Sequence, residues 1–531
     1  MMLIFYSCGK KKADYIFYHG QVHTFDSLNS RAAAFAVLRG KIIETGTTAD
    51  LMEKYEATEK TDLQNKHVYP GLIDAHSHFY GLGSFMQMVD LGGSRSFDEV
   101  VERCRKFYDA HHPSVLLGRG WDQNLWPDKK FPVNDLLNKY FPSIPVMLKR
   151  IDGHAVIVND HVLALASISS NTKTDGGEII QEKGKPTGVL IDNAVDLAEK
   201  FIPKPTLNDK IRAFKTAQEH CFEYGLTSVS DAGLEQAEIW LLDSLQKAGL
   251  IKMRVYAMIS ISDQNVEEFL KRGIYKTASL NVRSFKMYAD GALGSRGACL
   301  LKPYSDMNEH GGFLLTPANK MEEYISRIST SDFQLNTHCI GDSANRTLLK
   351  LYAKYLKGKN DKRWRIEHAQ VMNKDDFHYF GDYNIIPSVQ PTHATSDMNW
   401  ADERLGLQRL KGAYAYKKLL EQNGWLPLGT DFPVEQVSPF YTFYAAVARK
   451  DAEGSPVNGF QTENELTRKQ ALKGMTIWAA KAAFEEHEKG SLEKGKYADF
   501  IILDNDLMTD DLLKIRNAKA LATYVGGEKV Y

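Results

Sequence analysis

From about residue 70 onward, short apolar runs alternate along the chain with longer segments in which apolar positions recur every three to four residues. One such longer segment begins at Asp342 and repeats apolar residues from Ala344 to Leu356. Strands that alternate with amphipathic helices are typical of parallel βα units. The runs predicted as strands are Gly71–Ala75, Thr227–Asp231, Met253–Ile259, Ser284–Ala289, Gln334–His338, Arg365–His368, Ile385–Val389 and Leu426–Gly429. Eight βα units predict an α/β fold, a (β/α)8 TIM-type barrel.

Strand-like patterns flank this middle part on both sides. They are Tyr15–Val22, Ala34–Leu38, Lys41–Glu44, Tyr497–Leu503 and Leu521–Tyr531. Short strands punctuated by glycine turns at both ends of the chain favour one small β-sandwich domain built from both termini, over residues 13–69 plus 485–531. Two unrelated β appendages are the alternative.

The connection between the first and second barrel strands is unusually long. It runs from about Gly81 to Pro205 and carries apolar segments and turns of its own. A normal βα connection has only about 2–6 residues. We therefore expect an inserted subdomain over residues 85–205, at the carboxyl end of the barrel, and a barrel formed by residues 70–84 plus 206–484.

Composition excludes several classes of protein. The 531 residues include 66 Lys and Arg against 67 Asp and Glu, a net charge of −1, so no overall field attracts nucleic acid or an anionic membrane. No stretch has the roughly 18 consecutive apolar residues of a transmembrane helix. The five cysteines form no Cys-x-x-Cys pair, which argues against a disulfide framework or a cysteine zinc site. A homodimer is left open.

Cys8 stands apart from the other cysteines. It ends an apolar run that begins at Met2, and Gly9 and three lysines follow it. That arrangement resembles the end of a bacterial lipoprotein signal, in which the cysteine is acylated after cleavage, although the run is short and lacks a basic start. Two interpretations stay open: a cell-envelope lipoprotein lipidated on Cys8, or a cytoplasmic protein.

Histidines and an aspartate stand at the carboxyl ends of the predicted barrel strands. His76 and His78 follow the first strand and leave the same face of an extended backbone, so they can share a metal ion. His338, His368 and Asp431 follow three later strands. Because TIM-barrel active sites form at this edge, the set predicts a metal centre there.

Lys286 interrupts the apolar run Ser284–Ala289. A buried ammonium is destabilised, so burial lowers the pKa of a lysine. The neutral amine can add CO2, and the resulting carbamate could bridge two metal ions. The alternative is a lysine whose charged end reaches solvent.

These motifs, in this order, resemble amidohydrolase family 3, and within it the YtcJ-like branch that includes N-substituted formamide deformylases. The resemblance covers nearly the whole chain from about Tyr15. The matching segments are Pro70–His78, Gly118–Asp122, Asp152–His154, Lys286–Gly291, Thr337–Ala344, Arg365–His368, Ser388–His393, Leu428–Pro433 and Gly490–Asp499. The chain departs from the usual pattern at Thr430 and Ala292, where serine is commoner.

The resemblance implies a role for each matching residue. His76 and His78 would bind the more buried metal ion, His338 and His368 the second, and carboxylated Lys286 would bridge them. Asp431 would contact metal and act as the base that takes a proton from the nucleophilic water. The implied cofactors are one or two divalent ions, with zinc expected, and the implied reaction is hydrolysis of a non-peptide C–N bond in a small amide, N-substituted formamide or cyclic amide.

Further residues are interpreted as contacts to the substrate. They are Trp121, Asp152, His154, Asp290, Gln390 and His393. Strand-end hydrogen bonds or packing within the insert are the alternative for each of them. Two other functions stay open at this point: a non-hydrolytic isomerase or decarboxylase on the same metal scaffold, and a catalytically silent metal- or ligand-binding protein.

Overall fold

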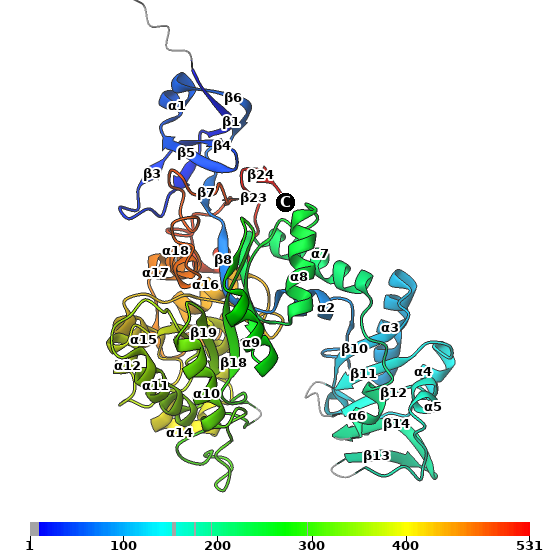
Figure 1. Cartoon of the computed structure of the whole chain (residues 1–531). Helices are drawn as coiled ribbons and strands as arrows, with labels where there is room; N and C mark the ends of the chain where they lie inside the picture. The colour runs from blue at the N-terminus through cyan, green and yellow to red at the C-terminus, as the bar shows by residue number, and fades with distance from the viewer. Residues whose placement is uncertain (1–9, 151–154, 175–176, 193, 295) are drawn as a thin grey trace, which may run out of the picture. The chain divides into compact units, whose positions relative to one another are not determined.

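The computed structural model describes residues 10–150, 155–174, 177–192, 194–294 and 296–531. The chain divides into two compact units (Figure 1). One comprises Met1–Tyr80 together with Phe214–Tyr531, and the other comprises Gly81–Ala213. Each unit is described by itself.

A parallel barrel forms the centre of the larger unit. Its strands pair in the order β21-β20-β19-β18-β16-β15-β8. Their bounds are β8 (Leu72–Ser77), β15 (Leu226–Leu234), β16 (Arg254–Ser260), β18 (Leu280–Tyr288), β19 (Gln334–Cys339), β20 (Arg365–His368) and β21 (Ile386–Ser388), with the short β17 (Tyr275–Lys276) antiparallel to β18. The remaining gap is spanned at Leu428, which forms a bridge to Val389 and accepts a hydrogen bond from Ala75 N at 3.1 Å. The predicted TIM-type barrel is confirmed.

Helices connect the barrel strands and cover them. The apolar repeat that begins at Asp342 becomes α11, which buries Ala344, Leu348 and Leu349 on one face. In chain order the helices of this unit are α1 (Thr48–Lys54), α2 (Phe79–Phe85, which runs on into the smaller unit), α7 (Leu207–Glu223, which begins there), α8 (Gln236–Lys247), α9 (Asp263–Arg272), α10 (Ala318–Ser329), α11 (Asp342–Leu356), α12 (His378–Asp382), α13 (Pro391–Asp397), α14 (Ala401–Leu410), α15 (Tyr416–Asn423), α16 (Pro439–Ala448), η2 (Thr462–Asn464), α17 (Arg468–Gly474), α18 (Ile477–Ala482) and α19 (Leu512–Arg516).

Two further sheets of the larger unit join residues from both ends of the chain. One has the order β5-β4-β1-β6 and the other β24-β23-β22-β7-β2-β3. The bounds are β1 (Lys11–Tyr18), β2 (Gln21–His23), β3 (Arg31–Ala32), β4 (Ala34–Leu38), β5 (Lys41–Gly46), β6 (Tyr55–Asp62), β7 (His67–Pro70), β22 (Phe500–Leu503), β23 (Ala522–Val525) and β24 (Glu528–Lys529). Phe17 and Phe35 of the first sheet contact Phe500 of the second, with ring centroids 4.8 and 5.0 Å apart. The composite β-sandwich is confirmed, and the alternative of two unrelated appendages is wrong.

The smaller unit contains one mixed sheet with the order β13-β14-β12-β11-β10-β9. Its elements are β9 (Val89–Asp90), α3 (Phe97–His111), β10 (Leu116–Trp121), η1 (Gln123–Leu125), α4 (Asp135–Tyr140), β11 (Val146–Arg150), β12 (Ala155–Val158), α5 (Asp160–Leu165), β13 (Gly177–Glu182), β14 (Lys185–Asp192) and α6 (Val195–Glu199). Val100, Leu116 and Leu148 belong to its hydrophobic core. An inserted subdomain after the first barrel strand is therefore confirmed.

A buried ion pair ties the C-terminal segment to the barrel. The Asp499 carboxylate accepts hydrogen bonds from Arg254 Nε at 2.6 Å, Arg254 Nη2 at 3.0 Å and Gly526 N at 2.8 Å. The Arg254 and Asp499 side chains are only 6% and 4% exposed. Removing one member of such a pair leaves an uncompensated buried charge.

We expect Asp499→Ala to lower the free energy of unfolding by about 3–5 kcal/mol, because the Arg254 guanidinium loses its counter-ion. The urea midpoint measures the change. Lys252→Ala is the matched control, since its ion pair with Glu528 on the same two segments is exposed, with side chains 45% and 59% accessible, and should contribute about 1 kcal/mol or less. Equal midpoint shifts in the two variants would contradict this.

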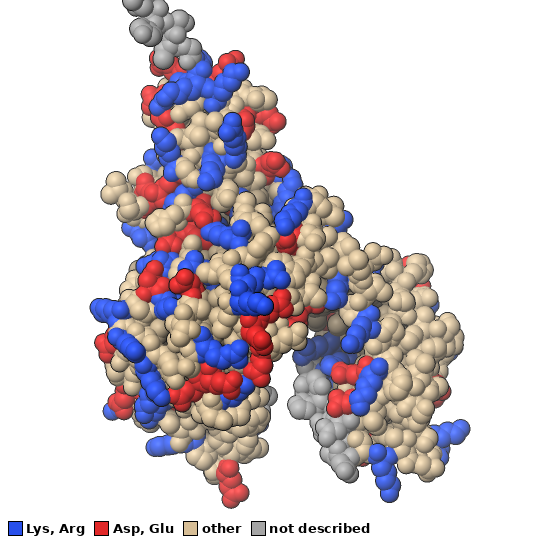
Figure 2. Space-filling view, in the orientation of Figure 1, with Lys and Arg blue, Asp and Glu red and all other residues tan. Residues whose placement is uncertain are grey.

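The surface carries charges of both signs. On the face shown in Figure 2, lysines and arginines are interspersed with aspartates and glutamates. Within the described part of the chain, every helix is too short or too polar to cross a membrane. Cys104, Cys221, Cys299 and Cys339 are all unpaired. Cys8 lies outside the described residues.

Candidate metal centre

Three of the predicted ligands meet at the carboxyl ends of the barrel strands. Ligand atoms of His76, His368 and Asp431 all lie within 4.8 Å of one another. The ring centroid of His368 lies 4.8 Å from that of His76 and 4.5 Å from that of His338. His78 joins the group through Nε2, which lies 3.2 Å from Asp431 Oδ1.

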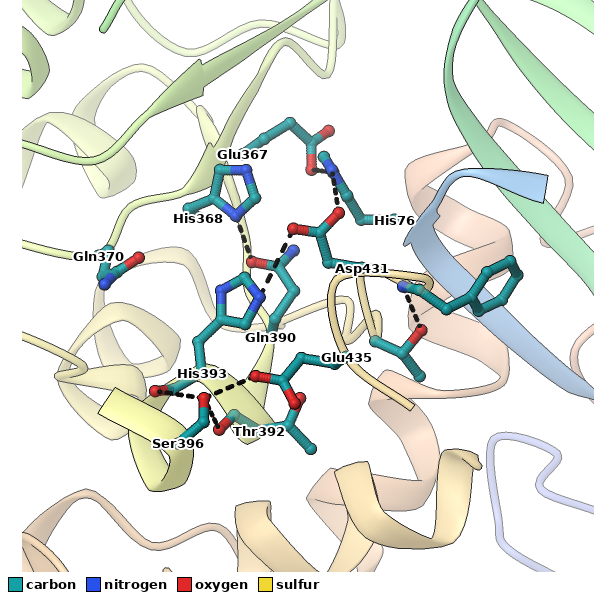
Figure 3. A network of polar contacts seen from close by, with 12 residues as sticks. His76, Glu367, His368, Gln370, Gln390, Thr392, His393, Ser396, Asp431 and Glu435 are labelled. Carbon is teal, nitrogen blue, oxygen red and sulfur yellow. Dashed lines mark hydrogen bonds and ion pairs between the residues drawn. The ribbon is translucent and has the colours of Figure 1, made fainter. Parts of the chain in front are cut away.

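The Asp431 carboxylate is the centre of this group (Figure 3). Its Oδ1 lies 3.5 Å from His76 Nε2, and its Oδ2 lies 3.5 Å from His393 Nε2. Burial acts to raise the pKa of this carboxyl, but the neighbouring His76 and a hydrogen bond from His78 outweigh it and hold the pKa well below its usual range. Asp431 is therefore ionised at neutral pH.

Two of these residues have strained backbones. His368 has φ 73° and Asp431 has φ 66°, both in the left-handed region that residues with a Cβ seldom occupy. Each such conformation costs on the order of 1–3 kcal/mol, and it persists where the surrounding structure enforces it. For Asp431 the enforcement includes a hydrogen bond from its own N to His76 O at 2.8 Å. The strain aims both side chains into the group.

The Asp74 carboxylate links His76 on β8 to Thr430, which precedes Asp431. Asp74 is not among the residues predicted from the sequence. Its carboxylate accepts hydrogen bonds from Thr430 Oγ1 at 2.7 Å, Thr430 N at 3.1 Å and His76 N at 3.0 Å. Burial raises the pKa of Asp74 to about 7, although these donors oppose the rise. Thr430 retains the hydroxyl of the commoner serine, so its departure from the family pattern keeps this link. A carboxylate inside an otherwise apolar strand was the signal available in the sequence.

Glu367 is a second residue that sequence reasoning missed. Its Oε2 lies 2.6 Å from His76 Nδ1, and both side chains are fully buried. A carboxylate only accepts, so His76 donates from Nδ1 and keeps the lone pair on Nε2, as in the carboxylate–histidine pairs behind many metal sites. Burial raises the pKa of Glu367, but His76 and Arg365 outweigh it and the pKa lies below its usual value.

Gln390 performs the same function for His368. Its Oε1 lies 2.7 Å from His368 Nδ1, so the imidazole donates to the amide oxygen and leaves Nε2 free. The backbone oxygen of Gln390 accepts a hydrogen bond from the Tyr416 hydroxyl at 3.0 Å. The side chain of Gln390, a predicted contact to substrate, thus lies behind His368 and orients it.

Several buried ring nitrogens of the group lack a hydrogen-bond partner among the described residues. They are His76 Nε2, His338 Nε2 and His393 Nε2. Burial lowers the pKa of His338 to about 3 and also lowers those of His76 and His368. Neutral imidazoles beside an ionised carboxylate are the ligand forms that bind metal, so the residues fit a divalent ion.

The family model described as the amidohydrolase family matches residues 59–531. The chain belongs to the amidohydrolase family. Two curated relatives are similar to it along nearly their whole length: the putative amidohydrolase YtcJ of Bacillus subtilis, 29% identical over 97% of this chain and 99% of the relative, and the N-substituted formamide deformylase of Arthrobacter pascens, 26% identical over 97% of each.

A solved structure agrees with that family. An uncharacterized metal-dependent hydrolase from Pyrococcus horikoshii superposes with a TM-score of 0.81 at 27% identity, covering 94% of this chain and 99% of the other. This amidohydrolase is thus a metal-dependent hydrolase of the superfamily.

Lys286 of this amidohydrolase is buried beside the candidate ligands. The residue is 1% exposed on β18, and its ammonium lies 4.7 Å from the centroid of the Tyr288 ring. Among the residues that the structure describes, no acidic or polar group forms a hydrogen bond or ion pair with it. Its charge depresses the pKa of both His76 and His338, which places it beside the candidate ligands.

The other residues interpreted as substrate contacts have varied surroundings. The Asp290 carboxylate accepts hydrogen bonds from Cys299 N, Ile340 N and Gly341 N at 2.8–2.9 Å. Trp121 is fully buried in the core of the smaller unit, and its indole N–H donates to Leu148 O at 2.8 Å. Asp152 and His154 lie outside the described residues. For these four, contact with a substrate stays a prediction.

Proposed function

We propose that this amidohydrolase hydrolyses a non-peptide C–N bond in a small molecule, namely an amide, an N-substituted formamide or a cyclic amide. The observation that carries the proposal is the Asp431 carboxylate, ionised, buried and 3.2–3.5 Å from His76, His78 and His393. The similarity to an N-substituted formamide deformylase supports the same bond type.

The proposed ligands would hold one or two divalent ions, with zinc expected. They are His76, His78, His338, His368, Asp431 and Lys286, the last as a carbamate. Such an ion supplies a Lewis acid that lowers the pKa of water toward about 7 and polarises a carbonyl.

The protein's own groups provide the remaining chemistry. Asp431 accepts a proton from the attacking water, the water oxygen bonds to the carbonyl carbon, and the C–N bond breaks. Asp431 then returns the proton to the departing nitrogen, so an acid and an amine are released. His393 faces the second Asp431 oxygen, and its proposed role is to hold the substrate oxygen. Glu367 and Gln390 keep two imidazoles oriented throughout.

Metal analysis and a substrate screen test this proposal. We expect the purified protein to contain about one to two divalent ions per chain and to release amine from some member of a panel of amides, N-substituted formamides and cyclic ureides. Chelation should abolish turnover, and added zinc should restore it. Circular dichroism is the control, because the barrel core is apolar and should stay folded without metal.

Three results would contradict the proposal. Amine release that survives complete removal of metal would rule out the metal centre. Conversion of the same substrates without any amine release would indicate a non-hydrolytic reaction, and metal binding without turnover of any kind would indicate a binding protein.

A further inference from the structure

We propose that the terminal β-sandwich contains a second divalent-cation site, formed by His23, His67 and Asp506. His23 Nε2 lies 3.4 Å from His67 Nδ1 and 3.8 Å from Asp506 Oδ1, and His67 Nδ1 lies 4.0 Å from Asp506 Oδ2. Within the described part of the chain, one other group of metal-ligating side chains is as compact, the candidate metal centre, and the two share no residue.

Strand register explains why these side chains meet. β2 and β7 are parallel neighbours, with Gln21 opposite His67 and Val22 opposite Val68. The valines face the sandwich core, so the alternation of side chains along a strand sends His23 and His67 to the opposite face. On the other side of β7, Leu503 of β22 pairs with His67, and the chain then turns to present Asp506.

The distances between these ligand atoms suit a transition-metal ion. Two ligand atoms at about 2.0–2.2 Å from a tetrahedral zinc lie roughly 3.3–3.5 Å apart. The His23–His67 separation already matches, and Asp506 requires a movement of a few tenths of an ångström. Two imidazoles and a carboxylate prefer zinc, cobalt or nickel over magnesium or calcium. The His67 and Asp506 side chains are 23% and 14% exposed, so an ion can enter from solvent.

Tyr69 orients two of the proposed ligands, Asp506 and His23. Its hydroxyl donates to Asp506 Oδ1 at 2.6 Å and accepts from Leu507 N at 2.9 Å. Its ring stacks on His23 with centroids 4.0 Å apart. A hydrogen bond to a ligating carboxylate and a fixed ring plane both orient ligands before the ion arrives.

Arg31 competes with a metal ion at this site. Its guanidinium contacts His23 Nε2. A guanidinium only donates, so His23 presents a lone pair at this nitrogen, which is the atom a metal needs. Arg31 is exposed on the short strand β3 and can turn toward solvent. A metal ion that binds His23 Nε2 would therefore displace the Arg31 guanidinium.

Zinc stoichiometry on the metal-stripped full chain tests the site. Equilibrium dialysis should show one equivalent fewer for His67→Ala than for the wild type, with amine-releasing activity unchanged. His19→Ala is the matched control, because His19 is an exposed histidine beside Asp62 in the same domain. It should bind as the wild type does. Equal stoichiometry in the wild type and His67→Ala would overturn the proposal, whether or not the catalytic proposal holds.

A second variant tests the competition with Arg31. Arg31→Ala should bind this extra equivalent roughly 10-fold more tightly, because the ion no longer displaces a guanidinium. The d–d absorption of bound cobalt should follow the same order. It should be strongest in Arg31→Ala, and in His67→Ala it should lack the contribution of one site. Unchanged affinity in Arg31→Ala would overturn the role assigned to Arg31.

Discussion

Replacing Asp431 with asparagine should lower kcat by roughly 10²–10⁴-fold, the usual contribution of a general base. The amide has the shape of the carboxylate but is a much weaker proton acceptor. His76, His78 and His393 stay in place around it, so the metal content should remain close to that of the wild type. Turnover of the best substrate and metal analysis of the same sample measure the two quantities.

Asp382→Asn provides the control for this substitution. Asp382 is an exposed carboxylate whose partner is the exposed His378, so its loss should leave kcat unchanged. Near-full activity in Asp431→Asn would show that another group receives the proton. A large loss of metal would show that Asp431 acts mainly as a ligand.

Lys286→Ala should remove most of the activity and at least one equivalent of metal. A carbamate on Lys286 would supply oxygen ligands to the metal ions, so the alanine variant would lose metal ligands as well as a side chain. Because the structure gives this ammonium no counter-ion among the described residues, a carbamate would also relieve an unpaired buried charge. Metal analysis and turnover together measure the effect.

Chemical rescue separates this account from a simple loss of packing. A short carboxylate such as propionate should restore part of the activity of Lys286→Ala by replacing the missing oxygens, and Lys286→Glu should retain some metal. Lys276→Ala is the control, since Lys276 lies on the neighbouring strand β17, is 32% exposed and forms an ion pair with Glu488. Full metal occupancy in Lys286→Ala would mean that the lysine does not bridge metal ions.

The barrel could be predicted from the sequence because its strands are buried on both faces and appear as short apolar runs. The last of them, Leu426–Gly429, is reduced in the structure to a bridge at Leu428. Pro427 has no N–H to donate to a sheet, and Leu428 N donates to Gly474 O instead of to a strand. A proline within a predicted strand was the visible warning.

The histidines and Asp431 could be predicted because each directly follows an apolar run. The sequence marks Asp74 only as a carboxylate in an apolar strand, and the functions of Asp74 and Glu367 could not be predicted because they depend on distant partners: Glu367 and His76 are 291 positions apart. Local patterns carry no information about which side chains meet across a barrel. The same holds for Trp121, whose burial within the smaller unit depends on strands and helices that the motif around it does not specify.

The sharing of one sandwich between the two ends of the chain has a consequence during protein synthesis. Tyr69 and Asp506 form a hydrogen bond although they are 437 positions apart. While the barrel is being translated, the edge of β7 that pairs with β22 has no partner, and such edges invite association with other chains. Completion of the sandwich must wait until residues 500–525 have left the ribosome. The nascent chain therefore spends most of its translation time with an open sheet, when binding by a chaperone would protect it most.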